Sequence, residues 1–251
     1  MKTPIAGLPW RYPCVKCPLR ANPAFRKFKK DELRYVAGFK AGELSVEPGT
    51  TIISEGSTTA HLYTVLSGWG FRYKLLDNGR RQILNFILPG DFVGLQASLL
   101  ADMQHSVEAL TAMLLCVFQR DRLWELYRQQ PGLAFDVTWL AAREEQILDE
   151  YLLSVGQRTA EERAAYLLLF LFLRAESRGL ARGNRIAFPF TQPHIADTLG
   201  LSLVHTNRIL NRLARRKMVV IGQRQMELVD RRQLAEVARW EPAEHQPRPF
   251  I

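Results

Sequence analysis

The spacing of apolar residues changes along the chain, and each change marks a different kind of secondary structure. From residue 44 to about residue 118, short apolar runs alternate with turn sequences such as Glu47-Pro48-Gly49. Short strands at a spacing of roughly ten residues are typical of a β-sandwich or jelly roll. Asn78-Gly79, between two of these runs, predicts a β-hairpin because both residues tolerate the positive φ angles of a two-residue turn.

After Pro131 the apolar residues recur at helical spacing and predict one long helix. A heptad-like series on this helix has Glu144 as its polar member, and Leu148 and Leu152 widen the apolar side. The other members of the series are Leu133, Val137, Leu140, Ile147, Tyr151 and Ser154. Such a helix between two domains usually pairs with a copy of itself, so we expect a homodimer formed along this series. The alternative is that the series packs against the chain's own β-domain.

Residues 191–219 contain two short helical patterns separated by Gly200. Thr191 and Ser202 are suitable N-caps, and apolar residues at intervals of three and four would pack one helix on the other. A short helix, a glycine-containing turn and a second helix form a helix-turn-helix, whose second helix enters the major groove of DNA. Two strand-like runs, 218–221 and 226–229, then predict a β-hairpin wing. Helices joined at a glycine also occur in other small domains, but the wing favours DNA binding.

The positive charge of the chain is concentrated in its C-terminal part. The whole sequence has a net charge of +9, and residues 158–251 hold 16 Lys and Arg residues against 9 Asp and Glu residues. A basic domain suits a polyanion such as double-stranded DNA. The longest apolar run, residues 164–173, is about half of the ~20 residues needed to cross a bilayer, and the N-terminus lacks an apolar signal segment. We therefore expect a cytoplasmic protein with no membrane partner.

These patterns predict an α+β protein with an N-terminal β-roll or jelly roll, a long helix and a C-terminal winged helix-turn-helix. Each of the two domains is long enough for its own core. The expected parts are a cysteine-containing arm (1–30), a β-roll sensor domain (31–130), a dimerisation helix (131–156), a winged helix-turn-helix domain (157–240) and a loose tail with three prolines (241–251).

A jelly roll can also belong to a cupin enzyme, which holds its metal through closely spaced histidines. His61 and His105 are isolated in this sequence, so we interpret neither as a metal ligand and expect no catalytic residue. A roll used as a protein-interaction or ligand-storage module is a further alternative.

The segment from residue 10 to residue 30 contains Cys14, Cys17 and seven basic residues, but no acidic one. A third cysteine, Cys116, lies in an apolar run. Three cysteines do not make a disulfide framework, and in a reducing cytosol a Cys-x-x-Cys pair is more often metal-binding or redox-active. Lys16 and Arg20 are expected to favour the thiolate forms. A thiol–disulfide switch, a zinc site that needs a fourth ligand and an inert structural role all remain open.

A β-roll, a long helix and a winged helix-turn-helix in this order resemble the Crp/Fnr superfamily of bacterial transcription regulators over nearly the whole chain. The similar residues are Leu-Pro-Gly-Asp-Phe-Val-Gly at 88–94, Ala-Glu-Glu-Arg-Ala at 160–164, and residues 191–213. The resemblance implies a homodimer that binds a palindromic DNA site, contacts RNA polymerase and carries a domain like those that bind cyclic nucleotides.

The resemblance also implies roles for individual residues of the helix-turn-helix. The family's phosphate contacts fall on Thr191, Gln192, Ser202 and His205, and its base-reading positions fall on Leu203, Val204, Asn207 and Arg208. Arg208 matches the family's guanine-reading arginine. Val204 departs from the family, which commonly has a glutamate there that accepts from cytosine; a valine can instead meet a thymine methyl group.

Members of the family that bind cyclic AMP grip its phosphate with an arginine-serine pair, which follows a Gly-Glu. The comparable positions here are Gln96 and then His105-Ser106. Because the arginine that would pair with the phosphate is absent, cyclic AMP is not expected as the ligand.

In the oxygen-sensing Fnr branch, N-terminal cysteines and one cysteine at the end of the roll hold a [4Fe–4S] cluster. Cys14, Cys17 and Cys116 match three of these ligands, whereas the remaining one would fall near Pro23 and is absent. A four-iron cluster normally takes four thiolates. The resemblance therefore implies redox or oxygen sensing through an iron–sulfur cluster held by three cysteines and an unidentified ligand.

Overall fold

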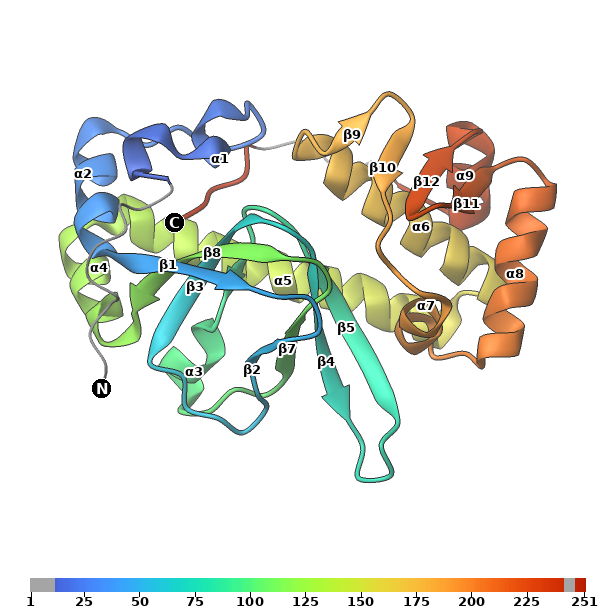
Figure 1. The fold of residues 1–251 in the computed structure, drawn as a ribbon, viewed down its shortest axis with the longest axis horizontal. Coiled ribbons are helices and arrows are strands. Elements are labelled where there is room, and N and C mark those ends of the chain that lie inside the picture. Colours follow the sequence, from blue (N-terminus) through green and yellow to red (C-terminus); the bar gives the residue numbers. More distant parts are fainter. Residues whose placement is uncertain (1–11, 242–246) are drawn as a thin grey trace. The chain divides into compact units, whose positions relative to one another are not determined.

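The computed structural model describes residues 12–241 and 247–251 (Figure 1). Residues 1–11 and 242–246, which include parts of the expected arm and of the expected tail, lie outside the described residues. The chain forms two compact units. Of the described residues, the first contains 12–72, 87–143 and 247–251, and the second contains 73–86 and 144–241.

The β-roll predicted from the short apolar runs is present as two four-stranded sheets. The strand order is β1-β8-β3-β6 in one sheet and β2-β7-β4-β5 in the other. The strands are β1 (Lys40–Val46), β2 (Thr51–Ile53), β3 (His61–Ser67), β4 (Gly70–Leu75), β5 (Arg81–Ile87), β6 (Phe92–Val93), β7 (Ser106–Ala109) and β8 (Met113–Gln119). The predicted turn at Asn78-Gly79 joins β4 to β5, and Gly79 has a φ angle of 80°.

Helices lie before, between and after the strands of the roll. They are the 3-10 helices η1 (Cys14–Lys16) and η2 (Arg120–Arg122) and the α-helices α1 (Pro18–Ala21), α2 (Lys30–Phe39), α3 (Leu95–Leu100), α4 (Leu123–Gln129) and α5 (Pro131–Gln157). Of these, α1, α2, α4 and the start of α5 add buried residues to one core with Leu62 and Leu66 of β3, whereas Tyr63 and Val65 face a second core. Because both faces of β3 are buried, its apolar run is nearly continuous.

The heptad-like series on α5 faces the protein's own interior. Leu133 and Val137 are fully buried in the core of the first unit, and Ile147 is 4% exposed. Tyr151 packs edge-on against Phe170, with 6.0 Å between the ring centroids. The prediction that this series pairs with a second copy is therefore wrong. The alternative, packing on the β-domain, holds for Leu133, Val137 and Leu140, whereas Tyr151 packs within the second unit.

A second heptad series, shifted by one residue, occupies the exposed side of α5. Its exposed members are Thr138, Ala141, Glu145, Leu148, Leu152 and Val155. One residue turns a helix by about 100°, so this series lies on a different face from the buried one. Leu148 and Leu152, which only widened the predicted seam, are 44% and 73% exposed.

The second unit contains the predicted winged helix-turn-helix. Its elements are α6 (Ala160–Ser177), β9 (Ala181–Arg182), β10 (Arg185–Ala187), α7 (Gln192–Leu199), α8 (Leu203–Arg215), β11 (Val219–Gly222), β12 (Gln225–Leu228) and α9 (Arg231–Ala238). The strands form one sheet in the order β11-β12-β10-β9. The wing turns at Gln223 and Arg224, whose φ angles are 51° and 58°.

The last segment, residues 247–251, is packed against the first unit, in contrast to the loose tail expected from its prolines. Phe250 and Ile251 are each 3% exposed. Arg248 pairs with Phe25 through a parallel β-bridge. In the described parts of the chain, we find no helix with the length and apolar character to span a membrane.

Candidate DNA-binding surface and cysteine site

The two N-caps that the sequence predicted lie at the starts of α7 and α8, and Gly200 lies in the turn between these helices. Thr191 precedes α7, and its backbone N–H donates to Nδ1 of His194 at 3.2 Å. Gly200 ends α7 with a φ angle of 65°, a conformation that glycine adopts at little cost. Ser202 then caps α8, since its Oγ accepts the backbone N–H of His205 at 3.3 Å. These contacts set the direction in which α8 leaves the turn.

Helix α8 has one buried and one exposed face. Thr206, Ile209 and Leu213 are at most 3% exposed and anchor the helix within the unit. The side chains predicted to touch DNA are all at least partly exposed, and they are Thr191, Gln192, Ser202, Leu203, Val204, His205, Asn207 and Arg208. Val204 is 71% exposed. Since an isolated domain gains nothing by exposing an apolar side chain, this position is suited to a contact surface.

Two arginines near the end of α8 are held by α6. Arg212 and Arg216 donate to the two carboxylate oxygens of Glu161 at 3.0 and 2.7 Å. The arginine side chains are 52% and 45% exposed. Both guanidinium groups therefore remain open to solvent while Glu161 limits their range of positions.

The β4–β5 hairpin, part of the second unit, contacts α7. Arg81 Nε donates to Asp197 Oδ2 at 2.8 Å, and the Gln82 amide donates to the Thr198 carbonyl at 3.1 Å. Burial lowers the pKa of His194, and the charge of Arg81 lowers it further. The hairpin and α7 also line a cavity of about 560 Å³. Sequence reasoning missed these contacts, because 116 residues separate Arg81 from Asp197 and no local pattern links them.

The three cysteines border the same core. Cys14 belongs to η1, Cys17 precedes α1, and Cys116 lies on β8 at 7% exposure. Cys14 and Cys17 pack against the core cluster that contains Cys116. A lysine that sequence reasoning missed lies near them: the Lys40 side chain is fully buried and its Nζ donates to Glu43 at 2.6 Å and to the Tyr12 carbonyl at 2.9 Å.

Burial raises the pKa of every cysteine thiol. The pKa values of Cys14 and Cys17 lie above their ordinary value, and that of Cys116 is raised to about 12. The Lys40 ammonium acts in the opposite direction on all three thiols, but desolvation has the larger effect. The expectation that neighbouring basic residues produce thiolates is therefore wrong: the charge of Arg20 does lower the pKa of Cys17, but desolvation outweighs it.

The residues do not fit the iron–sulfur cluster that the resemblance implies. Within residues 12–241 and 247–251, no three His, Cys, Asp or Glu side chains are grouped closely enough to hold a metal ion. The three thiols lie beside one core, but a four-iron cluster normally takes four thiolates, and Pro23 occupies the region where the fourth cysteine would fall.

The positions compared with the cyclic AMP site are occupied by the protein's own contacts. His105, at the place of the phosphate-gripping arginine, is 6% exposed. Ser106 Oγ accepts the backbone N–H of Glu55 at 2.9 Å, and Gln96 Oε1 accepts the backbone N–H of Gln104 at 3.3 Å. A phosphate at this place would meet an imidazole and an engaged hydroxyl rather than a guanidinium.

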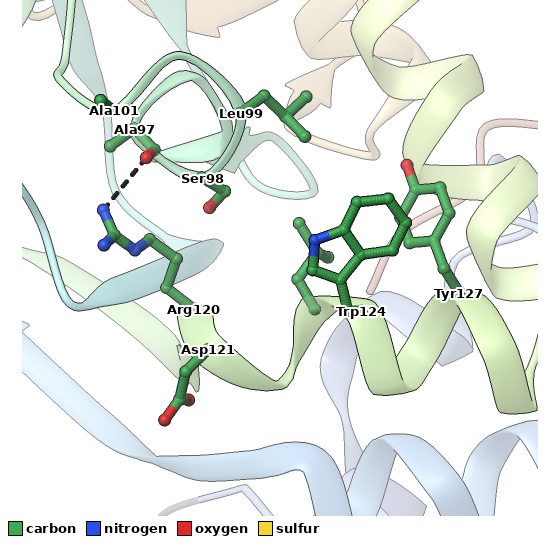
Figure 2. A pocket seen from close by; sticks show the side chains of 9 residues that line it. Ala97, Ser98, Leu99, Ala101, Arg120, Asp121, Trp124 and Tyr127 are labelled. Carbon is green, nitrogen blue, oxygen red and sulfur yellow. Dashed lines mark hydrogen bonds between the residues drawn. The ribbon is translucent and has the colours of Figure 1, made fainter.

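A separate cavity of about 310 Å³ lies between α3 and α4. Figure 2 shows the rings of Trp124 and Tyr127 on one side of it and Leu99 across from them. Arg120 points to the α3 side, where it donates to the Ala97 carbonyl at 3.0 Å. None of the residues predicted to bind DNA or a cluster lines this cavity.

Comparisons with known proteins agree with this arrangement. Residues 43–130 match the cyclic nucleotide-binding domain, and residues 162–237 match the Crp-like helix-turn-helix domain. The nitrogen fixation regulation protein FixK of Bradyrhizobium diazoefficiens is 30% identical over 222 residues, which cover 86% of this chain and 90% of that protein. The transcriptional activator protein FnrL of Cereibacter sphaeroides is 28% identical, with coverages of 90% and 91%.

A solved structure of similar fold is that of FixK2 from Bradyrhizobium japonicum. It has a TM-score of 0.71 and 30% identity, and the match covers 78% of this chain and 96% of that one. The relatives are transcription regulators rather than enzymes. The chain, with its β-roll, long helix and winged helix-turn-helix, therefore belongs to the Crp/Fnr family of DNA-binding transcription regulators.

Proposed function

We propose that this regulator reads a palindromic DNA site in the cytoplasm with the exposed face of α8. The observation that carries the proposal is the exposure of Arg208 and Val204 opposite the buried residues of the same helix. Arg208 would read guanine by two parallel hydrogen bonds, and Val204 would meet a thymine methyl group. Leu203 and Asn207 complete the base-reading set.

Four residues near the starts of α7 and α8 would fix the register on the DNA backbone. Thr191, Gln192 and His205 are exposed and can reach phosphate oxygens. Ser202 Oγ already accepts the His205 N–H, but its hydroxyl proton can still be donated to a phosphate. Contacts of this kind position the protein without selecting a sequence.

The dimer that a palindromic site needs would form along the exposed series of α5. Leu148, Leu152 and Val155 are 44%, 73% and 41% exposed, and they recur at intervals of four and three residues. A seam with this repeat is the usual surface of a two-helix coiled coil. RNA polymerase is the further partner that the family suggests.

Selection of bound fragments from a random DNA library tests the proposed reading. We expect two inverted half-sites with centres about one helical turn apart, with guanine at one position of each half-site. A single, non-repeated motif would contradict a dimer on a palindrome, and enrichment without any motif would contradict base reading by α8.

For the signal, we propose a redox response of the cysteine arm that uses the thiols themselves. In this step a hydroperoxide oxidises Cys14 and Cys17 to a disulfide and is reduced to an alcohol and water, while both thiol protons pass to the departing oxygens. Because their pKa values are raised by burial, the resting thiols react slowly and the arm must open first. No cluster takes part, and the buried His105 supports a regulator that does not use cyclic AMP.

Two measurements test the proposed signal. Thiol titration after peroxide treatment should show the loss of two thiols together with a changed affinity for the selected DNA. Anaerobic purification with iron and sulfide assays should give a colourless protein, and bound iron would contradict the thiol mechanism. Calorimetry with cyclic AMP should show no saturable heat.

A further inference from the structure

The segment Pro247-Arg248-Pro249-Phe250-Ile251, here called the docked tail, is bound to the first unit like a peptide ligand (Figure 1). Its backbone joins the arm: Arg248 N–H donates to the Ala24 carbonyl at 2.8 Å, and Arg26 N–H donates to the Arg248 carbonyl at 2.9 Å. These two hydrogen bonds form an isolated parallel β-bridge between the docked tail and the arm, a small version of the backbone pairing by which extended peptides are often bound.

Side chains of the docked tail fill apolar and charged subsites. Phe250 packs against Phe28 with 4.6 Å between ring centroids, and against Phe25 edge-on at 5.5 Å. Arg248 pairs with Asp91 at 2.8 Å, and the two side chains are 12% and 1% exposed. A buried apolar anchor beside a buried ion pair gives both affinity and sequence selectivity.

The floor of this site is the Pro89-Gly90-Asp91 turn of the roll. Asp91 holds the turn through Oδ2, which accepts the Leu88 N–H at 2.8 Å, and holds the tail through Oδ1. Gly90 has a φ angle of 87°, and a Cβ there would lie 2.3 Å from the Phe25 ring. The turn therefore accommodates the arm and the tail together.

The site also reaches the strand pair that carries Cys116. Thr64 Oγ1 donates to the carbonyl oxygen of Ile251 at 2.6 Å, a buried contact. Thr64 lies directly opposite Cys116 in the β3–β8 register, and both Phe250 and Ile251 belong to the core cluster of Cys116. The docked tail thus packs in the same core as the Cys116 thiol, beside the β3–β8 strand pair.

We propose that the groove formed by residues 24–28, the Pro89-Gly90-Asp91 turn and Thr64 is a peptide-binding site. Its occupant is the chain's own docked tail, which is a releasable ligand. Because residues 24–26 form one edge of the site, the tail and the cysteine arm stabilise each other, and loosening either one loosens the other. The existence of the binding site does not depend on the proposed redox response. Its influence on the cysteine arm does rest on that proposal and adds a form of regulation to it.

Binding of a synthetic peptide to a chain shortened after residue 246 tests the site. A labelled peptide of residues 244–251 should bind the shortened chain with saturation, and should bind the full chain at least about tenfold more weakly because the docked tail competes. An Arg248→Ala peptide should lose at least about tenfold in affinity. Equal binding of both peptides, or equal binding to both chains, would overturn the proposal.

Thiol labelling of the full chain gives a second measure that does not depend on the shortened protein. Arg248→Ala should speed the alkylation of Cys14, Cys17 and Cys116 several-fold, whereas Arg232→Ala, which removes an equal charge from a side chain 90% exposed, should not. Unchanged rates in Arg248→Ala would overturn the coupling to the arm. A rate that depends on protein concentration would mean that the tail docks on another copy and would overturn the intramolecular assignment.

The two experiments separate this proposal from the redox response. Peptide binding measured under a thiol reductant reports on the site alone. If the peptide binds while peroxide leaves DNA affinity unchanged, the docking site stands and the redox response fails.

Discussion

In the second unit the arginines of α8 stay at the surface, whereas in the first unit the ion pairs Lys40–Glu43 and Arg248–Asp91 are almost completely buried. The Arg212 side chain is 52% exposed in its pair with Glu161, but the Lys40 side chain is 0% exposed in its pair with Glu43. An exposed pair contributes little to stability, while breaking a buried pair leaves an uncompensated charge. The surface arginines thus remain available to a polyanion, and the buried pairs hold chain segments in place.

The largest effect should come from removing the buried ammonium near the cysteines. Lys40→Met should lower the free energy of unfolding by about 3 to 5 kcal/mol, because the Glu43 carboxylate loses its charge partner. The Tyr12 carbonyl also loses the donor that lies 2.9 Å away. Urea titration followed by circular dichroism measures the change, and a loss below about 1 kcal/mol would contradict the comparison.

A substitution of a surface charge serves as the control and should leave the free energy of unfolding almost unchanged. Arg232→Ala removes a side chain that is 90% exposed and pairs with Glu236 on the same helix. The free energy of unfolding of this variant should be indistinguishable from that of the unaltered protein.

The next largest effect should be on the dimer. Leu152→Asp places a charge in the exposed series of α5, and each copy should cost about 2 kcal/mol of association free energy. Light scattering should then show monomers at concentrations where the unaltered protein is a dimer. Leu153→Asp is the control, since Leu153 is 46% exposed but lies outside the series. Equal masses for both variants would contradict the proposed dimer face.

A smaller effect is expected at the surface arginines that we propose contact DNA. Arg208→Ala should lose about 1 to 3 kcal/mol of binding free energy and relax specificity at one base pair. Arg215→Ala should instead weaken binding to all DNA sequences by the same factor and reduce the salt dependence of the DNA affinity. Gel shifts with the selected site and its single-base variants measure both changes, and unchanged specificity in Arg208→Ala would remove it from the base-reading set.

The smallest effect concerns the start of α6. Hydrogen bonds from Arg239 and Thr159 lower the pKa of Glu162 from 4.5 to about 2. A lowered pKa means that the folded state favours the carboxylate, so the stabilisation is present above pH 4.5 and is lost as the pH falls towards about 2. Unfolding midpoints of the unaltered protein and of Glu162→Gln should differ at pH 6 and converge near pH 2. A constant difference would show that Glu162 contributes no pH dependence.

The sequence predicted the helix-turn-helix because its signals are local. Thr191, Gly200 and Ser202 are caps and a turn residue whose roles depend on neighbours a few positions away. The Asn78-Gly79 hairpin is predictable for the same reason. The fold class followed from such patterns and from the resemblance they carry, and the positions proposed to read bases are at least partly exposed.

The errors arose where tertiary burial decides the outcome. Helix α5 has two apolar series one residue apart, and the sequence does not distinguish the one that packs inside from the one that faces solvent. Basic neighbours suggested thiolates at Cys14 and Cys17, but desolvation raises their pKa values. The prolines suggested a loose C-terminal segment, but Arg248 forms an ion pair with Asp91, a residue 157 positions earlier in the sequence.

The docked tail makes the first unit discontinuous along the chain, and this has a consequence during protein synthesis. The ribosome delivers residues 12–143 first, then the whole DNA-binding unit, and only then residues 247–251. The β-roll can therefore begin to fold early, as N-terminal domains do, yet the groove beside Phe25 stays open until residues 247–251 have been synthesised. During that interval the nascent regulator exposes an apolar groove that these residues later cover.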